Sequence, residues 1–561
     1  MAWIAYNSAY TDGKQVCRDQ VCRDGEKQNK NRPTRKRRET KTAGSDAQGV
    51  RTGNKEDASM KKLAIGCAAA LAAAAAVAAE NDVFEVSDVD ELTNACAKAT
   101  SNFNTIKLKP RVYDLTGIVM DRSGFHHLVV ATYSGQLVGT GPRPEDTVIK
   151  GGGAADGCRI LRLDSNYCTV SNLTFTGGYI KNGSGGVANN GYTTFTDCVF
   201  SNNYAQSTGG ALDQARTLTR CKFIDNHSEY RGGALRTVPS GNPGVFRDCW
   251  FEGNHSTVGG VAEYGASWSN CVFVGNYSRV DAGCFCRGGN PNVCIDCHFT
   301  NNVSGVDYSV GEKVAAFTNC TFYGNSSGGF YMIGSCPSVY GCEFASNTGL
   351  PIIASCTLRN CTVADTYGNK GNSNPLVKDS VLYNCLVARN TGGNSSRSQI
   401  AAGATAAMYN CTVVSNAYYA QNYSVVGCAA LVNTLLVGNY VARTGKMQDL
   451  ASKGGYPGVL TNCLWTAQSE DSGYPFDQAR FSGGGLVERA GFVDAAGGDF
   501  RLARSSPARN AGWSDSAYLA LVGPADLAGG DRVYMDDPAP QIDVGCFEFC
   551  RRAAGVVFLF R

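Results

Sequence analysis

A short motif with the pattern x-Cys-x-Phe-x-x-Asn recurs through the middle of this chain and limits its possible folds more than any other feature. The copies that keep all three signature residues are Asp197–Asn203, Arg220–Asn226, Asp248–Asn254, Asn270–Asn276, Asp296–Asn302, Asn319–Asn325 and Gly341–Asn347. Looser copies begin at Asn172, Asn360, Asn384, Asn410, Asn433 and Asn462. Successive copies lie roughly 19 to 29 residues apart, which is typical of solenoids whose repeats pack only against their neighbours.

The spacing inside the motif predicts a short strand with one buried face. Residues two apart on a strand point the same way, so Cys198 and Phe200 share a face that Val199 and Ser201 do not. Stacked coils bury that face, because each strand pairs in parallel with its copy about 4.8 Å away. We therefore predict an all-β, right-handed parallel β-helix with inward columns of Cys and Phe. A third column, of Asn, is expected to take the left-handed conformation at a sharp corner and to bond to itself.

The first eighty residues differ from the repeats and predict export. Residues 1–59 include a basic, polar stretch (Lys27–Lys41) without apolar periodicity, which is typical of disordered chain. Met60 opens a short basic segment and an Ala-rich apolar run that ends at Ala79, the pattern of a secretory signal peptide. Because such signals stand at an N-terminus, we expect translation to begin at Met60. An uncleaved anchor over Leu63–Ala78 is the alternative.

The sequence contains 25 Cys residues, which in a secreted protein ordinarily indicates disulfide bonds. In the motif, however, Cys occupies an inward position where other repeats have Leu173 or Thr434, and a buried free Cys acts as a small hydrophobe. We therefore predict a column of packed thiols. The sequence leaves open whether three further pairs are bridges or additional core: Cys284 with Cys286, Cys294 with Cys297, and Cys546 with Cys550.

Composition and pattern divide the chain and limit its partners. The net charge is +3 and charged residues are 18% of the total, so we expect no field strong enough to bind nucleic acid. The amphipathic segment Asp88–Ala99 predicts a short helix that covers the open end of the first coil. After Trp465 the repeat fades. The predicted division is a basic extension upstream of the true start (1–59), a signal peptide (60–79), an N-terminal cap and first coils (80–170), β-helix repeats (171–470), a C-terminal module (471–550) and a tail (551–561).

A second motif follows each corner and places charged residues in one column. It reads Gly209-Gly-Ala-Leu-Asp213, then Gly232-Gly-Ala-Leu-Arg236, then Gly259-Gly-Val-Ala-Glu263. Opposite charges on neighbouring coils predict a ladder of ion pairs, each contributing little at a surface. The alternative is a catalytic face made of Asp213, Arg236 and Glu263. Its two carboxyl groups, on alternate coils, would lie roughly 10 Å apart, near the separation found in inverting glycosidases.

Together, the two motifs resemble the repeat of polymorphic outer-membrane proteins, as in Phe200-Ser-Asn-Asn203 followed by Gly209-Gly-Ala-Leu212. That resemblance implies a bacterial surface protein or adhesin. More widely, residues 83–465 resemble the pectin-lyase-like right-handed β-helix superfamily, which includes polysaccharide lyases and hydrolases. The segments Ser505–Gly512 and Ile542–Glu548 resemble the terminal module of secreted bacterial β-helix proteins with varied surface-sorting tails, the choice-of-anchor proteins.

These observations predict a protein that is secreted, either extracellular or associated with the outer-membrane surface. We expect it to bind a polysaccharide or another cell-surface or envelope component along its flank, without catalysis. The alternative is a polysaccharide lyase or glycoside hydrolase that uses Asp213, Arg236 and Glu263. No cofactor or metal is expected for binding, and Ca²⁺ enters only with the lyase alternative, in which several Asp would hold it.

Overall fold

The computed structural model describes the part of the chain that carries the repeats. The described ranges are 82–99, 103–120, 125–130, 134–163, 168–189, 192–238, 243–286, 292–329, 331–349, 351–368, 373–396, 398–453, 457–533 and 541–549. The predicted basic extension (1–59), signal peptide (60–79) and tail (551–561) lie outside these residues and stay predictions. Within the described ranges, no helix has both the length and the apolar character needed to cross a bilayer.

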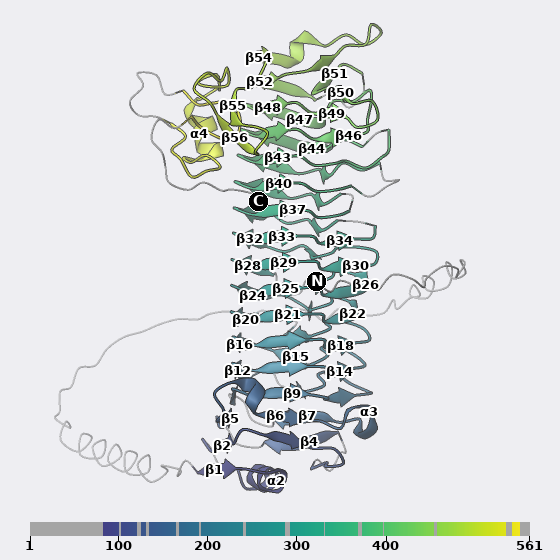
Figure 1. Ribbon diagram of the computed structural model, residues 1–561, viewed down its shortest axis with the longest axis vertical. Helices are drawn as coiled ribbons and strands as arrows, with labels where there is room; N and C mark the ends of the chain where they lie inside the picture. Colours follow the sequence, from purple (N-terminus) through teal and green to yellow (C-terminus); the bar gives the residue numbers. More distant parts are fainter. Residues whose placement is uncertain are drawn as a thin grey trace, which may run out of the picture. The chain divides into compact units, whose positions relative to one another are not determined.

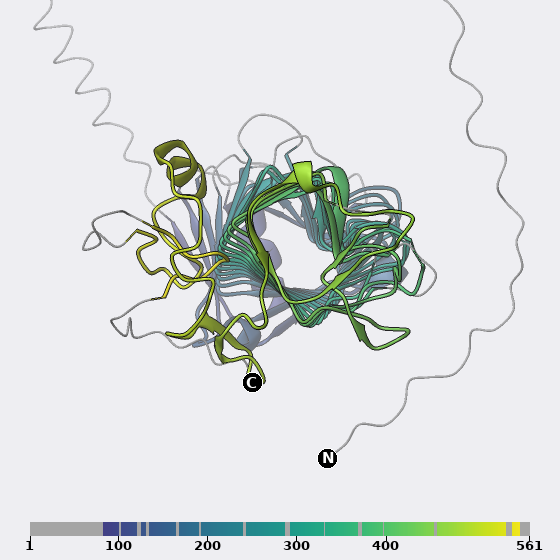
Figure 2. The same cartoon turned by 90° about the horizontal axis from the view of Figure 1, so that it is seen from above.

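The described chain winds into coils that stack along one axis (Figure 1). Strands of successive coils join a single 40-stranded sheet and pair in parallel from the first coils to the last. Viewed along the axis, the coils superimpose as a ring (Figure 2). The predicted all-β parallel β-helix is therefore confirmed.

The large sheet has three faces, and most coils contribute one strand to each. The first face holds the strands that follow the Gly-Gly motif: β11 (Ala188–Asn189), β15 (Leu212–Ala215), β19 (Leu235–Thr237), β23 (Ala262–Glu263), β27 (Phe285–Cys286), β31 (Gly311–Glu312), β35 (Ile333–Gly334), β38 (Ile353–Ala354) and β41 (Val377–Lys378). The second face holds the strands before the Cys position: β1 (Val83–Val86), β2 (Thr105–Leu108), β5 (Gln136–Gly139), β8 (Thr169–Ser171), β12 (Thr194–Thr196), β16 (Thr217–Thr219), β20 (Gly244–Arg247), β24 (Ala266–Ser269), β28 (Val293–Ile295), β32 (Ala316–Thr318), β36 (Ser338–Tyr340), β39 (Thr357–Arg359) and β42 (Val381–Tyr383).

The third face holds the Cys-x-Phe strands, preceded by two strands of the first coils. Its members are β3 (Val112–Asp114), β6 (Val148–Lys150), β9 (Thr174–Thr176), β13 (Val199–Ser201), β17 (Lys222–Ile224), β21 (Trp250–Glu252), β25 (Val272–Val274), β29 (His298–Thr300), β33 (Thr321–Tyr323), β37 (Glu343–Ala345), β40 (Thr362–Ala364), β43 (Leu386–Ala388), β45 (Thr412–Val414) and β48 (Leu435–Val437). Three longer strands run through two faces each: β44 (Ala401–Tyr409), β47 (Val426–Val432) and β52 (Val459–Trp465).

A separate sheet of seven strands, here called the flank sheet, lies between the third face and the Gly-Gly turn. Its strands are β10 (Tyr179–Ile180), β14 (Tyr204–Ala205), β18 (His227–Ser228), β22 (His255–Val258), β26 (Tyr277–Asp281), β30 (Val303–Ser304) and β34 (Ser326–Ser327). Smaller sheets pair β4 (His126–Val130) with β7 (Arg159–Leu163), β46 (Ala417–Tyr418) with β49 (Tyr440–Val441) and β50 (Lys446–Met447), β51 (Leu450–Ala451) with β53 (Gln468–Ser469), and β55 (Phe492–Asp494) with β56 (Asp499–Leu502).

The helices of the described chain are short. Helix α2 (Val89–Lys98) occupies the predicted position: Asp88 caps it by accepting a hydrogen bond from the Glu91 amide, and it buries Leu92. Capping satisfies an amide that the first turn leaves free. The others are α3 (Gly153–Asp156), α4 (Ser516–Val522) and two 3₁₀ turns, η1 (Pro144–Asp146) and η2 (Gln478–Arg480).

The predicted Cys and Phe columns fill the interior. Phe rings stack from coil to coil, as between Phe273 and Phe299, whose centroids lie 4.7 Å apart with planes inclined by 3°. The cysteines of the motif are buried and carry no disulfide. Cys284, Cys286, Cys294 and Cys297 are likewise buried and form no disulfide, so they are additional core and not bridges.

Burial raises the pKa of the Cys221 and Cys249 thiols well above the ordinary range, so few of their thiolates exist to react. We predict that a reducing agent leaves the melting temperature unchanged. We also expect the thiols to react with a thiol-specific reagent only after denaturation. Thermal scans with and without dithiothreitol, and timed labelling in buffer and in guanidinium chloride, test this. A fall in melting temperature on reduction would show that structural bridges exist.

The Asn column forms the predicted ladder but not the predicted backbone conformation. The left-handed residue is the one before it, for example Asn301 (φ 54°) or Gly275 (φ 60°). The column Asn itself points inward and is fully buried. Asn302 donates from Nδ2 to the carbonyl of Phe273 at 2.9 Å and to Oδ1 of Asn325 at 3.0 Å. Its own Oδ1 accepts from the amide and side chain of Asn276. The side chain thus replaces backbone bonds that the bend removes.

Parallel pairing continues past the predicted boundary at residue 470, because β54 (Phe481–Leu486) pairs with β52. The chain then turns back, and residues 487–533 and 541–549 pack against the outside of the last coils (Figure 2). Asn residues at the outer corners hold this module: Asn384 donates to the carbonyl of Val522 at 2.7 Å, and Asn433 bonds to both backbone groups of Trp513 at 2.8 Å.

Candidate functional site

The predicted charged column lies on the first face, where β15, β19 and β23 bring Asp213, Arg236 and Glu263 onto consecutive coils. Arg236 and Glu263 are register partners, and the register shifts within β15. Gly209 and Gly232 turn the chain before these strands with positive φ, and a Cβ at either would lie 2.9 Å from the amide nitrogen of Arg236 or Glu263. The glycines of the motif therefore allow the turn to lie close against the next coil.

Asp213 and Arg236 form a two-pronged ion pair. Arg236 donates from Nε to Oδ1 and from Nη2 to Oδ2, the latter at 3.0 Å. The Asp213 side chain is only 2% exposed and that of Arg236 is 25% exposed. Burial raises the pKa of Asp213, and the charges of Arg236 and Arg159 oppose that rise. A buried carboxylate held in this way is costly to unpair, and its guanidinium partner has two donors already in use.

Glu263 is paired with Arg231, which the motif alignment missed. The Arg231 Nη1 atom lies 3.6 Å from Glu263 Oε1, and the Glu263 side chain is 2% exposed. Arg231 stands just before the Gly-Gly motif, in a turn bridged to Thr208 and Val258. Because Arg231 belongs to this turn and not to the repeated motif, aligning the motif copies did not place it beside Glu263. The predicted residues do form ion pairs, but the cation paired with Glu263 is Arg231, from the turn before the Gly-Gly motif, and not Arg236 of the motif column.

The geometry at this column suits an ion-pair ladder better than a catalytic centre. An inverting hydrolase needs carboxyl groups that can reach a sugar and a water, and a lyase needs a base that can accept a proton. Asp213 and Glu263 are buried, and Asp213 is clasped by Arg236. One cavity lies on the flank sheet and another beside the C-terminal module, and both are lined by residues other than these three. The catalytic role of Asp213, Arg236 and Glu263 stays an untested prediction.

A column of aromatic side chains runs along the flank sheet. Register pairing aligns an aromatic residue at the first position of five of the seven strands: Tyr179, Tyr204, His227, His255 and Tyr277. The last two strands, β30 and β34, begin with Val303 and Ser326. The rings from Tyr179 to His255 contact their neighbours, with centroids 4.3 Å apart for Tyr179 and Tyr204 and 4.1 Å for His227 and His255. Because residues alternate along a strand, the next position points inward, as Ala205 and Ser228 do. The aromatic column therefore faces outward.

Polar side chains form a second outward column two residues further on. Gln206, Glu229, Thr257 and Arg279 occupy it and, with Tyr204 and Tyr230, line a cavity of about 310 Å³. Burial and the neighbouring His255 lower the pKa of His227, and the Glu229 charge opposes this shift. This surface was not predicted from the sequence. The available signal was the Tyr or His that directly follows four successive column Asn residues: Asn203-Tyr204, Asn226-His227, Asn254-His255 and Asn276-Tyr277.

Comparison with family models supports the fold. Residues 292–435 match the model described as a right handed beta helix region. Residues 197–213 match the Chlamydia polymorphic membrane protein repeat. The fold is thus a right-handed parallel β-helix in which one stretch, residues 197–213, matches the polymorphic membrane protein repeat. Among curated proteins, none matches this chain significantly.

The solved structures that resemble the chain include polysaccharide lyases and a glucanase. A mutant of the family 6 alginate lyase AlyGC is 12% identical over 72% of this chain and 53% of its own, with a TM-score of 0.34. This chain thus spans about half the length of that lyase. A mannuronic acid specific family 6 lyase from human gut microbiota is 11% identical over 61% and 87%, with a TM-score of 0.33. A GH87 alpha-1,3-glucanase from Streptomyces thermodiastaticus is 11% identical over 74% and 69%, with a TM-score of 0.21. Scores this low assign no activity to the chain.

Proposed function

We propose that this chain is a secreted or cell-surface β-helix protein that binds a polysaccharide along the flank sheet without catalysis. The observation that carries the proposal is the outward aromatic column of Tyr179, Tyr204, His227, His255 and Tyr277. The polymorphic membrane protein repeat at residues 197–213 is consistent with a place at the outer-membrane surface, where such a ligand would be met.

The chemistry of the column suits a sugar polymer. A sugar ring has apolar C–H patches and a rim of hydroxyl groups, and Tyr and His offer an apolar body with a polar tip. Tyr277 and Tyr230 are 42% and 62% exposed, so they leave aromatic surface open to a ligand. The side chains repeat once per coil, about every 4.8 Å, and a polymer that repeats along its length can use several of them together.

The proposal predicts that the double variant Tyr179→Ala/Tyr277→Ala loses affinity for polysaccharide by about tenfold or more, because few residues carry most of the free energy of binding at such surfaces. The measurement is affinity electrophoresis and titration calorimetry with a panel of soluble glucan, mannan, galactan, arabinoxylan, polygalacturonate and alginate. Tyr323→Ala is the matched control, because Tyr323 is 54% exposed on the third face, away from the column. An equal loss in both variants, or none in either, would contradict the proposal.

The same panel tests the catalytic alternative. The protein is incubated with each polysaccharide, and new reducing ends and unsaturated products are measured. We expect no product. Product formation that Asp213→Asn and Glu263→Gln both abolish, with the fold retained by circular dichroism, would instead make the charged column an active site.

A further inference from the structure

The aromatic column of the flank sheet has a definite direction and definite ends. Its strands follow one another along the axis of the solenoid (Figure 1), and their first residues pair in register from Tyr179 to Tyr277. Tyr179 begins the column because β10 is the first strand of the sheet. The next two partners are Val303 and Ser326, so the aromatic rings stop at Tyr277. At the strand spacing of about 4.8 Å, the first and last rings are about 19 Å apart.

The rings of the column hold one another in place. Tyr179 and Tyr204 are stacked with planes inclined by 15°, and His227 and His255 with planes inclined by 27°. Stacking occupies the ring faces, so a ligand that crosses these pairs meets their edges. The Tyr204 hydroxyl donates to Glu229 Oε1 at 3.1 Å, and that oxygen lies 3.9 Å from His227 Nε2. The edges are therefore positioned before a ligand arrives, which lowers the entropy lost on binding.

A row with one polar edge per coil suits a chain that offers one hydroxyl-bearing unit per coil. Tyr hydroxyl groups donate and accept hydrogen bonds, as the two nitrogens of a neutral His ring do between them. Successive sugar residues meet successive coils only if each residue advances the chain by about the coil spacing, about 4.8 Å. Extended β-1,4-linked chains such as mannan and xylan advance by nearly a full sugar length per residue. Coiled α-1,4-linked chains advance far less, so their residues lose step with the coils.

We propose that the flank sheet selects its polysaccharide by shape. It takes an extended linear chain that lies along the axis of the solenoid, with one sugar residue on each coil from Tyr179 to Tyr277. The footprint is about five residues, since the column spans five coils at about one residue per strand spacing. This inference rests on the proposed function and adds to it the class of polymer, the direction of the bound chain and the length of the site.

The test measures the affinity of the full chain against ligand length, from disaccharide to octasaccharide, by titration calorimetry. Linear β-1,4-linked manno- and xylo-oligosaccharides are the extended series, and α-1,4-linked malto-oligosaccharides are the coiled series. We expect the affinity for at least one extended series to rise about three- to tenfold with each residue, because each residue adds a hydrogen bond. The rise should level off at the pentasaccharide. The coiled series should gain little beyond the disaccharide.

Two variants move the ends of the footprint in opposite directions. Tyr179→Ala removes the first ring, so the affinity should level off at the tetrasaccharide. Val303→Tyr adds a ring next to Tyr277, its register partner, so the affinity should rise by a further three- to tenfold at the hexasaccharide, about the gain from one more hydrogen bond. Val493→Tyr is the matched control, because it adds the same ring at a 54% exposed position of β55, outside the flank sheet. It should leave the length dependence unchanged.

The outcomes separate this inference from the proposed function. If wild type binds polymers of the panel but its affinity does not rise beyond the disaccharide, the flank binds polysaccharide without this footprint. Coiled ligands that bind as tightly as extended ones, or a plateau that neither Tyr179→Ala nor Val303→Tyr moves, also overturn the inference. If wild type binds no polymer, the proposed function fails and the footprint with it. Melting curves confirm that each variant is folded.

Discussion

Asn302→Ala is expected to lower the free energy of unfolding by about 3–6 kcal/mol, the largest effect of any single substitution proposed for this chain. The side chain bonds four buried groups of three other residues, Asn276, Phe273 and Asn325. Without it, the amide and side-chain nitrogens of Asn276 lose their acceptor and the carbonyl of Phe273 loses its side-chain donor. Leaving a buried polar group unsatisfied costs about 1–3 kcal/mol each.

The neighbouring Asn301 provides a matched control. It is exposed, has φ of 54°, and other copies of the motif carry Gly at its position, as at Gly275 and Gly324. Asn301→Gly should therefore change the free energy of unfolding by less than about 1 kcal/mol. Urea denaturation followed by circular dichroism measures both variants. A cost for Asn302→Ala no greater than that of the control would show that the ladder is dispensable.

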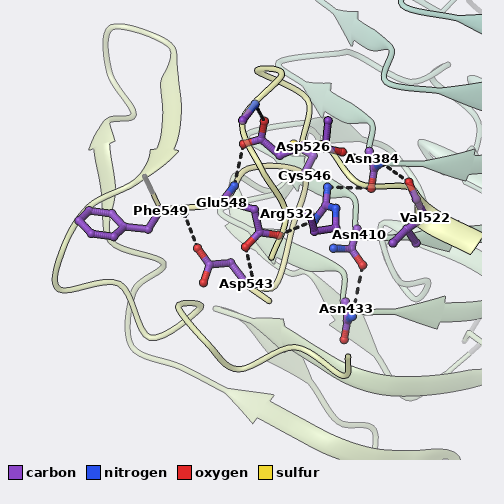
Figure 3. Close-up of polar contacts among 12 residues, drawn as sticks. Asn384, Asn410, Asn433, Val522, Asp526, Arg532, Asp543, Cys546, Glu548 and Phe549 are labelled. Atoms are coloured by element: carbon purple, nitrogen blue, oxygen red, sulfur yellow. Dashed lines mark hydrogen bonds and ion pairs between the residues drawn. The ribbon is translucent and has the colours of Figure 1, made fainter. Parts of the chain in front are cut away.

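Arg532→Met is expected to destabilise the C-terminal module by about 3–5 kcal/mol, the usual cost of removing one partner of a buried ion pair. Arg532 is 1% exposed and donates to Glu548 within the module and to Asn384 Oδ1 on the β-helix at 2.9 Å (Figure 3). The substitution leaves the Glu548 carboxylate buried without its cation. It also removes the hydrogen bond to Asn384 that joins the module to the β-helix. We expect protease cleavage and hydrogen exchange to rise within residues 487–549 before the β-helix unfolds.

The pH dependence of this variant gives a second readout. Burial raises the pKa of Glu548 well above its usual value, and the Arg532 charge opposes the rise. With Arg532 gone, the pKa of Glu548 in the folded state rises further above its unfolded value. The stability that the folded state gains by holding this proton is complete below the unfolded pKa. It is lost as pH increases through the folded pKa. The defect of Arg532→Met should therefore shrink toward about pH 4.

Two further variants support the interpretation. The exposed Arg504→Met should leave proteolysis unchanged. Adding Glu548→Gln to Arg532→Met should recover part of the loss, since an uncharged side chain costs less to bury. Unchanged protease resistance in Arg532→Met would mean that apolar packing alone holds the module. That packing includes Phe500 and Val544 of the module, which lie against side chains of the last coils.

Much of the fold can be predicted from the sequence, because the physics of a solenoid is local. Every coil must bury one face of its strands and pair with the coils on either side, so the same residues recur at the same positions. Cys and Phe at a spacing of two identify an inward face, and repetition identifies stacking. Even the fate of the cysteines follows, because Leu173 and Thr434 stand in the thiol column of other coils. The same alignment placed Asp213, Arg236 and Glu263 on consecutive coils.

Tertiary structure alone decided which contacts those residues make. Glu263 takes Arg231 as its cation because the turn before the Gly-Gly motif brings that side chain across, and turn geometry is not periodic. The Asn column turned inward since its amides complete the hydrogen bonding of a bend whose left-handed position falls one residue earlier. The flank sheet consists largely of two-residue strands, too short to show a period. Contacts of the C-terminal module, such as Asn433 with Trp513, join residues far apart in the chain. A sequence pattern identifies the positions that repeat. Contacts made across turns and between modules do not repeat, because they depend on which side chains the folded coils bring together.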